Sequence, residues 1–166
     1  RALDGWTLTH QYVVFADRTG DIGLQLTGRY PLRGAEHDYA GIAPAPGWQA
    51  RYDWAGAIPG PQLPRLLNPP RGVIATANNN ALPAGYPHRL GYDYAIPFRA
   101  QRIEQLLDAR RTHDLKSMQA IQRDTQSLAA RAQVAPHRDV NPDTEAARIA
   151  LAPLPGRDGT LAAAAP

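Results

Sequence analysis

The sequence predicts an α+β protein in which strands and helices occupy separate parts of the chain. Eleven of the 16 prolines fall within residues 31–97, whereas residues 98–135 contain neither proline nor glycine. All twelve aromatic residues lie at or before Phe98. Aromatic and turn-forming residues favour strands joined by loops, and a stretch without Pro or Gly favours helices. We therefore expect strands and loops over residues 1–97 and helices over residues 98–152.

The first predicted element is a β-hairpin over residues 12–27. Residues 12–16, Tyr-Val-Val-Phe-Ala, combine β-branched and aromatic side chains and predict a buried strand. Residues 17–21 carry turn-forming side chains, and residues 22–27 alternate apolar with other residues and predict the returning strand.

The rest of the first part is predicted as loop, with one further strand. Residues 30–68 contain only short extended pieces around residues 48–54, and the tract 60–70 is too rich in Pro for a helix or a central strand. The apolar residues Gly72–Ala77 predict a third strand, which leads directly into three consecutive asparagines, residues 78–80.

Three helices are predicted in the second part. The first has Pro97 at its first position and continues to about Arg111, with apolar residues at helical spacing. The second begins after Asp114, a good N-cap, and its apolar stripe runs to Ala132. A short third helix is expected around residues 143–151. Residues 153–166 are predicted as a loop tail, and residues 1–166 together as a single partial domain.

Composition excludes several classes of function. The chain has no Cys, and its two serines, Ser117 and Ser127, both lie within the predicted second helix, so a self-contained Ser-His-Asp or Cys-His site is not expected. The net charge is only +3, and no basic run with interleaved aromatics indicates nucleic-acid binding. No apolar stretch approaches the roughly 20 residues of a membrane span. Because the sequence opens on Arg1 without an apolar leader, we expect an internal piece or a processed product.

Metal binding has weak support in the sequence. The five histidines are scattered without metal-ligand spacing. Residues 17–21 resemble part of a calcium loop, but a hairpin turn explains the same residues. The acidic residues around His37 could bind a cation, although a solvated loop is the more ordinary explanation. No metal-ligating residue is therefore predicted.

Two features are consistent with catalysis, each with an ordinary structural alternative. Asn78 follows an apolar strand, and a side-chain amide there can donate to a developing oxyanion, whereas the alternative is an Asn-rich turn that satisfies its own backbone. Arg99 lies at the start of the first predicted helix, where its guanidinium suits the fixing of an amide or a carboxylate. The alternative for Arg99 is an ordinary surface position.

A series of short motifs follows one unbroken order over residues of about 10 to 132. They are Phe15-Ala16-Asp17-Arg18-Thr19-Gly20-Asp21-Ile22-Gly23, Gly28-Arg29-Tyr30-Pro31 with Arg33, Tyr52-Asp53-Trp54-Ala55-Gly56, Leu63-Pro64, Asn68-Pro69, Gly72-Val73-Ile74-Ala75-Thr76-Ala77-Asn78-Asn79, Tyr86-Pro87, Arg99-Ala100-Gln101-Arg102-Ile103, Ile121-Gln122-Arg123-Asp124 and Ala129-Ala130. This series resembles the middle of the catalytic subunit of penicillin acylases. Gly156-Arg157-Asp158-Gly159 is a weaker match, because the family usually has Trp at its second place. Tyr12 departs from the family's usual Asn.

The resemblance implies an αββα sandwich, the fold of N-terminal-nucleophile hydrolases that include penicillin, cephalosporin and acyl-homoserine-lactone acylases. These enzymes cleave an acyl-amide bond with an N-terminal Ser whose own α-amine acts as the base. Asn78 matches the Asn whose side chain helps to form the oxyanion hole. Arg99 matches the Arg that helps to orient that Asn. Because the chain begins with Arg1, the resemblance places the nucleophile outside it, so we expect the chain alone to be inactive.

The resemblance also implies partners and a location. The expected partners are the remaining acylase segments or chains, one with an N-terminal Ser, together with a small amide substrate and no nucleic acid. Members of the family are exported as precursors that cut themselves into two chains, which implies a periplasmic or secreted protein. No cofactor is expected for catalysis, although many members bind structural calcium. The alternative is a non-catalytic, truncated acylase-like domain that only binds or packs.

Overall fold

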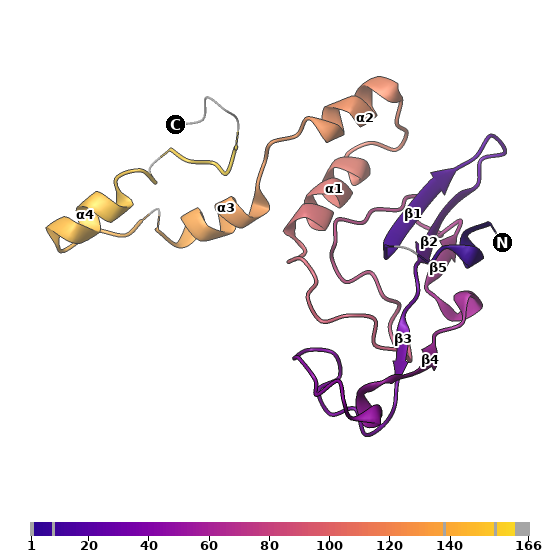
Figure 1. Ribbon diagram of the computed structural model, residues 1–166. Coiled ribbons are helices and arrows are strands. Elements are labelled where there is room, and N and C mark those ends of the chain that lie inside the picture. The colour runs from indigo at the N-terminus through magenta and orange to yellow at the C-terminus, as the bar shows by residue number, and fades with distance from the viewer. Residues whose placement is uncertain (1, 8, 138, 155, 162–166) are drawn as a thin grey trace. The chain divides into compact units, whose positions relative to one another are not determined.

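A computed structural model describes residues 2–7, 9–137, 139–154 and 156–161 (Figure 1). The chain divides into two compact units, Arg1–Tyr94 and Ala95–Pro166, and each is described by itself. The described strands lie in the first unit and the four α-helices in the second. The mixed α+β composition, with strands before helices, is confirmed. The single partial domain over residues 1–166 stays a prediction.

A three-stranded antiparallel sheet forms the first unit's main element. Strands β1 (Gln11–Ala16), β2 (Ile22–Thr27) and β5 (Arg65–Leu67) lie in the order β1-β2-β5. The predicted hairpin is therefore confirmed. The three-residue β5 lies within the Pro-rich tract but at a sheet edge, where neighbouring prolines do not interrupt a ladder.

The hairpin turn is closed by its own side chains. The Asp17 carboxylate Oδ1 accepts hydrogen bonds from the Thr19 amide at 2.9 Å, the Thr19 hydroxyl at 2.7 Å and the Asp21 amide at 3.0 Å. Gly20 has a φ of +97°, which residues with a side chain rarely adopt. These contacts explain why the acidic, Gly-containing segment forms a turn.

The prediction that the first hairpin strand is buried is wrong. Val14 is 48% exposed and Phe15 is 42% exposed. The reason is the place of β1, which pairs with β2 on one side and with no other strand in the described part of the chain. An apolar sequence indicates a strand that needs covering, but it does not say whether the covering layer belongs to the same 166 residues.

A second, two-stranded sheet and three short 3-10 helices complete the first unit. Strand β3 (Pro31–Arg33) pairs antiparallel with β4 (Trp54–Ala57) in a region that was predicted as mostly loop. The 3-10 helices are Ala2–Gly5, Ala50–Tyr52 and Gly60–Gln62. The hydrophobic core cluster of the described residues is small and consists of Leu26, Tyr30, Ile58 and Leu63.

The third strand predicted over Gly72–Ala77 is not formed. Residues 73–76 are partly buried but irregular, and no described strand pairs with them. Strand propensity alone is insufficient, because a strand exists only when a neighbouring backbone satisfies its N–H and C=O groups. Asn78 therefore follows an irregular segment.

The second unit contains α1 (Phe98–Asp108), α2 (Leu115–Gln122), α3 (Leu128–Val134) and α4 (Glu145–Leu151), with a 3-10 turn at Ala135–His137. Pro97 is the N-cap of α1, one position before the predicted one. The prediction of Asp114 as an N-cap is confirmed, because its side chain accepts from the Ser117 amide at 2.7 Å. The short predicted helix around residues 143–151 is also confirmed as α4. None of the described helices has the length and apolar content that a membrane crossing requires.

The prediction of one continuous second helix to Ala132 is wrong, because the chain breaks between α2 and α3. In the gap, Thr125 accepts from the Leu161 amide at 2.9 Å and the Ser127 amide donates to the Gly159 carbonyl at 2.7 Å. Gly159 has a φ of +89°, and an added Cβ would lie 2.8 Å from the Ser127 carbonyl oxygen. The Thr125 carbonyl and the Ser127 amide are therefore bonded to residues 159–161, so they cannot make the hydrogen bonds of a continuous helix. The loop predicted for residues 153–166 is irregular in its described part apart from the Thr160 bridge to Gln126, and residues 155 and 162–166 lie outside the described residues.

Candidate functional site

The three consecutive asparagines of the first unit differ in what their side chains do. Asn79 Oδ1 accepts a hydrogen bond from the Ala77 amide at 3.0 Å, and Asn80 Oδ1 accepts from the Leu82 amide at 3.1 Å. Both therefore satisfy the local backbone, as the turn alternative requires. Asn78 is exposed and has a φ of +60°, in the left-handed region that Asn tolerates better than most residues. The candidate oxyanion-hole donor thus lies at the surface of this unit.

Asn68 ties the beginning of the segment that carries Asn78 to the hairpin. Its backbone N–H donates to the Ile22 carbonyl at 2.9 Å, and its side-chain Oδ1 accepts from the Ile22 backbone N–H at 2.9 Å. Its Nδ2 also donates to Asp21 Oδ1 at 2.7 Å. Asn68 has a φ of +46°, so its backbone turns away from β5 at this point. The Asn68-Pro69 pair is one of the family motifs, but its sequence does not predict these contacts.

The other end of the same segment is also tied. The Tyr86 hydroxyl donates to the Gln62 carbonyl at 2.9 Å, and the His88 Nε2 lies 3.0 Å from Gln62 Oε1. Because both ends of the segment 69–85 are anchored, its irregular backbone is held by side-chain contacts and not by a sheet ladder. The sequence does not indicate a role for Gln62, because its partners Tyr86 and His88 lie 24 and 26 positions further along the chain.

Arg99 lies in the first turn of α1, in the second unit, and is exposed. It lines an open groove of about 540 Å³ together with apolar side chains. These include Ile103, Leu106, Ile121 and Leu128. Asn78 and Arg99 thus belong to different units, each described by itself, and the expected pairing of their side chains stays a prediction.

A bidentate ion pair lies in the wall of the same groove. Arg102 donates from Nε to Asp124 Oδ2 at 2.8 Å and from Nη2 to Asp124 Oδ1 at 2.6 Å. These hydrogen bonds hold the pKa of Asp124 below its usual value of 3.8. The two parallel bonds fix α1 to the segment after α2, so they hold the shape of the groove beside Arg99. Both residues belong to family motifs, but their contact is not predictable from the sequence, because they lie 22 positions apart.

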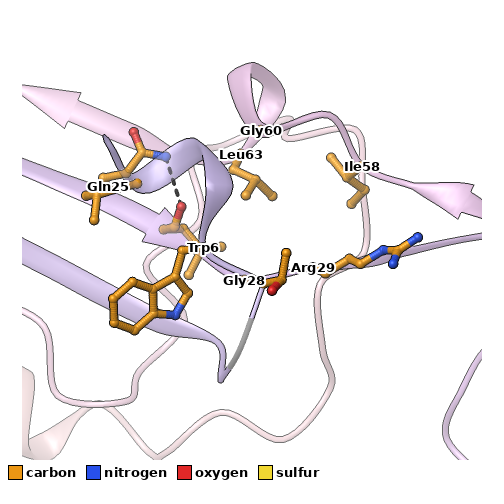
Figure 2. Close-up of a pocket in the computed structure, with 10 residues that line it drawn as sticks. Trp6, Gln25, Gly28, Arg29, Ile58, Gly60 and Leu63 are labelled. Carbon is orange, nitrogen blue, oxygen red and sulfur yellow. Dashed lines mark hydrogen bonds between the residues drawn. The ribbon is translucent and has the colours of Figure 1, made fainter. Parts of the chain in front are cut away.

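A smaller pocket of about 100 Å³ lies in the first unit (Figure 2). Trp6 and Arg29 lie at opposite ends of it, with Leu63 and Ile58 along one side. Gln25 lines the pocket but donates its Nε2 to the Leu26 carbonyl at 2.9 Å. Binding sites for drug-sized ligands have volumes of roughly 300–1,000 Å³, so this pocket is too small for an acyl-amide substrate.

Both serines take part in helix capping: Ser127 is the N-cap of α3, and Ser117 completes the capping box of α2 whose N-cap is Asp114. The Ser117 Oγ lies 3.3 Å from His113 Nδ1, which resembles a nucleophile–base pair. However, the same oxygen accepts from the Asp114 amide and donates to the Asp114 carbonyl, both at 2.9 Å, and the residue is only 6% exposed. The Ser127 Oγ accepts from the Ala130 amide at 3.1 Å. Neither hydroxyl is placed for attack on a substrate.

The described residues do not fit a calcium site. They contain no group of three or more His, Asp or Glu side chains arranged to hold a metal ion. In the turn that resembles a calcium loop, Asp17 Oδ1 already accepts three hydrogen bonds from the turn itself. Structural calcium, which the family resemblance implies, stays a prediction.

Comparisons with known proteins identify relatives of the chain. The acyl-homoserine lactone acylase QuiP of Pseudomonas aeruginosa is 41% identical over 116 residues, which cover 70% of this chain and 13% of that protein. The penicillin acylase 2 proenzyme of Pseudomonas sp. (strain SE83) is 37% identical over 126 residues, covering 76% of this chain and 16% of that protein. The chain thus spans about one-seventh of these relatives.

A solved structure and a family model agree with these relatives. The thermostable penicillin G acylase of Alcaligenes faecalis matches with a TM-score of 0.64 and 20% identity, over 89% of this chain and 27% of that one. At this identity the likeness shows the fold alone. The family model described as penicillin amidase matches residues 1–164. The chain therefore belongs to the penicillin amidase family.

Proposed function

We propose that the chain is part of an amidohydrolase that cleaves an acyl-amide bond of the penicillin, cephalosporin or acyl-homoserine-lactone type. In this proposal the attacking Ser lies at the N-terminus of another chain or segment, and its own α-amine takes up the hydroxyl proton. The chain contributes Asn78 as an oxyanion donor and Arg99 as a positioning residue. It adopts part of the family's αββα sandwich.

The exposed Asn78 is the observation that carries the proposal. Its two neighbours accept hydrogen bonds from the local backbone, and Asn78 lies within the same turn, exposed and at a φ of +60°. An amide N–H donates to a carbonyl oxygen more strongly as that oxygen gains negative charge, so the donor lowers the barrier to tetrahedral-intermediate formation. Residues other than glycine that adopt a left-handed backbone conformation cluster at functional sites.

The test is the substitution of Asn78 in the complete acylase, by which we mean this chain together with the remaining acylase segments. Asn78→Gly removes the amide but keeps a residue that adopts positive φ freely. We expect a decrease in kcat of roughly 10²–10³-fold, with a smaller change in KM, because one oxyanion donor contributes about 3–4 kcal/mol. The measurement is hydrolysis of a chromogenic amide.

Asn80→Ala is the matched control, because Asn80 is also exposed and loses only its bond to the Leu82 amide. We expect nearly unchanged turnover for this variant. If Asn78→Gly is also as active as the parent enzyme, the side chain is not an oxyanion donor. If Asn78→Ala is inactive while Asn78→Gly is active, the role of Asn78 is conformational.

A non-catalytic acylase-like domain is the second candidate. It is favoured by the two serines, both of whose hydroxyls take part in the capping of a helix. The two candidates differ in composition, because the enzyme requires a partner that begins with Ser. Intact-mass analysis of the protein purified from its source distinguishes them: a single 18.1 kDa species that leaves amides intact supports the non-catalytic domain.

Export to the periplasm or secretion, with cleavage of a precursor into two chains, belongs to the same proposal. The support is family membership, because the relative from Pseudomonas sp. (strain SE83) is named as a proenzyme. The N-terminal residue of the partner chain, determined by terminal sequencing, tests the cleavage.

A further inference from the structure

Strand β1 has an outward-facing backbone edge. The Asp17 amide donates to the Asp21 carbonyl at 2.9 Å, and Phe15 lies opposite Gly23 in the same register. In an antiparallel ladder, hydrogen-bonded pairs alternate along the strand. The main-chain groups of Val13 and Phe15 therefore face β2, and those of the alternate residues, including Val14, face away from it.

This edge has none of the features that normally protect a sheet edge. Proteins discourage pairing at an edge with charged side chains, prolines or bulges. Residues 11–16 contain no charged residue and no Pro, and the pairing of β1 with β2 is regular along all six residues. In the described part of the first unit, no strand pairs with this edge (Figure 1).

Both faces of the same sheet carry exposed apolar side chains. On one face, Val14 and Leu66 flank Leu24 and are 48% and 44% exposed. On the other face, the Phe15 ring lies so close to Gly23 that a Cβ there would be 2.3 Å from the ring. A sheet that is apolar on both faces is typical of an interior layer and not of a surface sheet.

We propose that β1 is an interior strand in the complete acylase, where an extended segment of the same acylase from outside these 166 residues pairs along its outer edge. The inference rests on the proposed function in one respect, namely that the chain works as part of a larger acylase. The length of the relatives supports this occupant, because the matched region is only 13–16% of each. Each relative therefore has ample further chain to supply a strand.

Amide hydrogen exchange at single-residue resolution tests the pairing. In the isolated chain, we expect slow exchange at Val13 and Phe15, which face β2, and fast exchange at Val14. In the complete acylase, we expect the Val14 amide to slow by at least about tenfold, because it gains a partner. An unchanged Val14 rate in the complete acylase would falsify the proposal.

A second copy of the chain is the competing occupant. If Val14 becomes protected in the isolated chain as the protein concentration rises, and gains nothing further in the complete acylase, β1 pairs with another copy and the proposal is wrong. Exchange does not require turnover, so an Asn78→Gly acylase serves equally well. The failure of this inference is therefore distinguishable from the failure of the proposed function.

A pair of variants gives an independent measurement. Val14→Pro removes the outward-facing N–H, whereas Val14→Thr keeps the N–H and the β-branched shape. We expect Val14→Pro to reduce the yield of assembled acylase several-fold relative to Val14→Thr, and to leave exchange at Phe15 slow in the isolated chain. Equal yields of the two variants would overturn the proposal.

Discussion

The contacts that stabilise the first unit differ in sequence separation from those that stabilise the second. In the first unit, the important contacts join distant residues: Asn68 binds the backbone of Ile22 from 46 positions away, and Tyr86 binds Gln62 from 24 positions away. In the second unit, the helices begin with contacts only three positions apart, such as Ser127 with Ala130. The first unit therefore depends on its tertiary arrangement, and the second depends strongly on local caps.

This difference applies to the two candidate site residues. Asn78 lies on an irregular segment whose ends are fixed by distant contacts, at Asn68 and at Tyr86. Arg99 lies in the first turn of a regular helix. We therefore expect the position of Asn78 to be sensitive to substitutions far away in the sequence, whereas Arg99 is held by its own helix and the contacts of that helix.

The largest effect on stability is expected from the substitution Asn68→Ala. It removes two side-chain hydrogen bonds, to Ile22 and Asp21, and leaves Ala at a φ of +46°, which Ala tolerates less well than Asn. We expect a loss of about 2 kcal/mol in the free energy of unfolding of the first unit. Amide exchange in β2 and β5 measures it.

Asn68→Gly is the matched control, because glycine adopts positive φ without strain. We expect it to lose only the hydrogen bonds, so its destabilisation should be about half that of Asn68→Ala. Equal stability of the Ala variant and the parent chain would show that the first unit does not depend on this long-range tie.

The substitution Ser127→Ala should change the stability of the second unit in opposite directions, depending on whether Ser127 lies inside a continuous helix or caps α3. If Ser127 were inside a continuous helix, as the sequence alone indicated, Ser127→Ala would stabilise the chain, because Ala is the best helix former. Because Ser127 is the N-cap of α3, we expect Ser127→Ala to destabilise the second unit by about 1 kcal/mol. Thermal unfolding of the variants measures the sign.

Ser127→Asp is the control for the cap, since an aspartate side chain also accepts from the amides of a first helical turn. We expect this variant to stay within a few tenths of a kcal/mol of the parent chain. A stabilising Ser127→Ala would mean that α2 and α3 form one helix in solution.

The same contrast explains what the sequence could predict. The hairpin and the Asp114 cap were predictable, because turn residues lie between the two strands and the cap lies beside its helix. The strand over Gly72–Ala77 was wrong, because pairing depends on a neighbour that the local sequence does not specify. The break before Ser127 was missed for a similar reason: its amide bonds to Gly159, 32 positions away.

The candidate site shows the same limit. Its two residues, Asn78 and Arg99, were named from the sequence because amide and guanidinium chemistry is visible in residue types and family motifs. The residues that hold their surroundings were not, because the Asn68 tie and the Arg102–Asp124 ion pair exist only once distant segments meet. The chemical type of a candidate site residue is therefore predictable from the sequence, whereas the contacts that position the residue are not.

The smallest effect on stability is expected when the pH is lowered, and it should differ between the two units. Lowered pKa values occur at Asp114, Asp124 and Asp158 in the second unit and at Asp17 in the first. At Asp124 the main cause is the hydrogen bond from Arg102. A carboxyl group whose pKa is lower in the folded state adds stability above its unfolded pKa, and this stability is lost as the pH falls through the folded pKa.

Asp124→Asn isolates the contribution of the ion pair. Because the Arg102 and Asp124 side chains are 25% and 20% exposed, we expect the variant to lose below about 1 kcal/mol at pH 7. The difference from the parent chain should shrink as the pH falls below about 4, because the unfolded parent chain then takes up a proton at Asp124 before the folded chain does, which lowers the stability of the parent. Urea unfolding of the second unit at pH 7 and pH 3, followed by amide exchange in α2 and α3, measures the two differences. A constant difference at both pH values would mean that Asp124 stabilises the groove beside Arg99 through packing, because the loss of its charge would then change nothing.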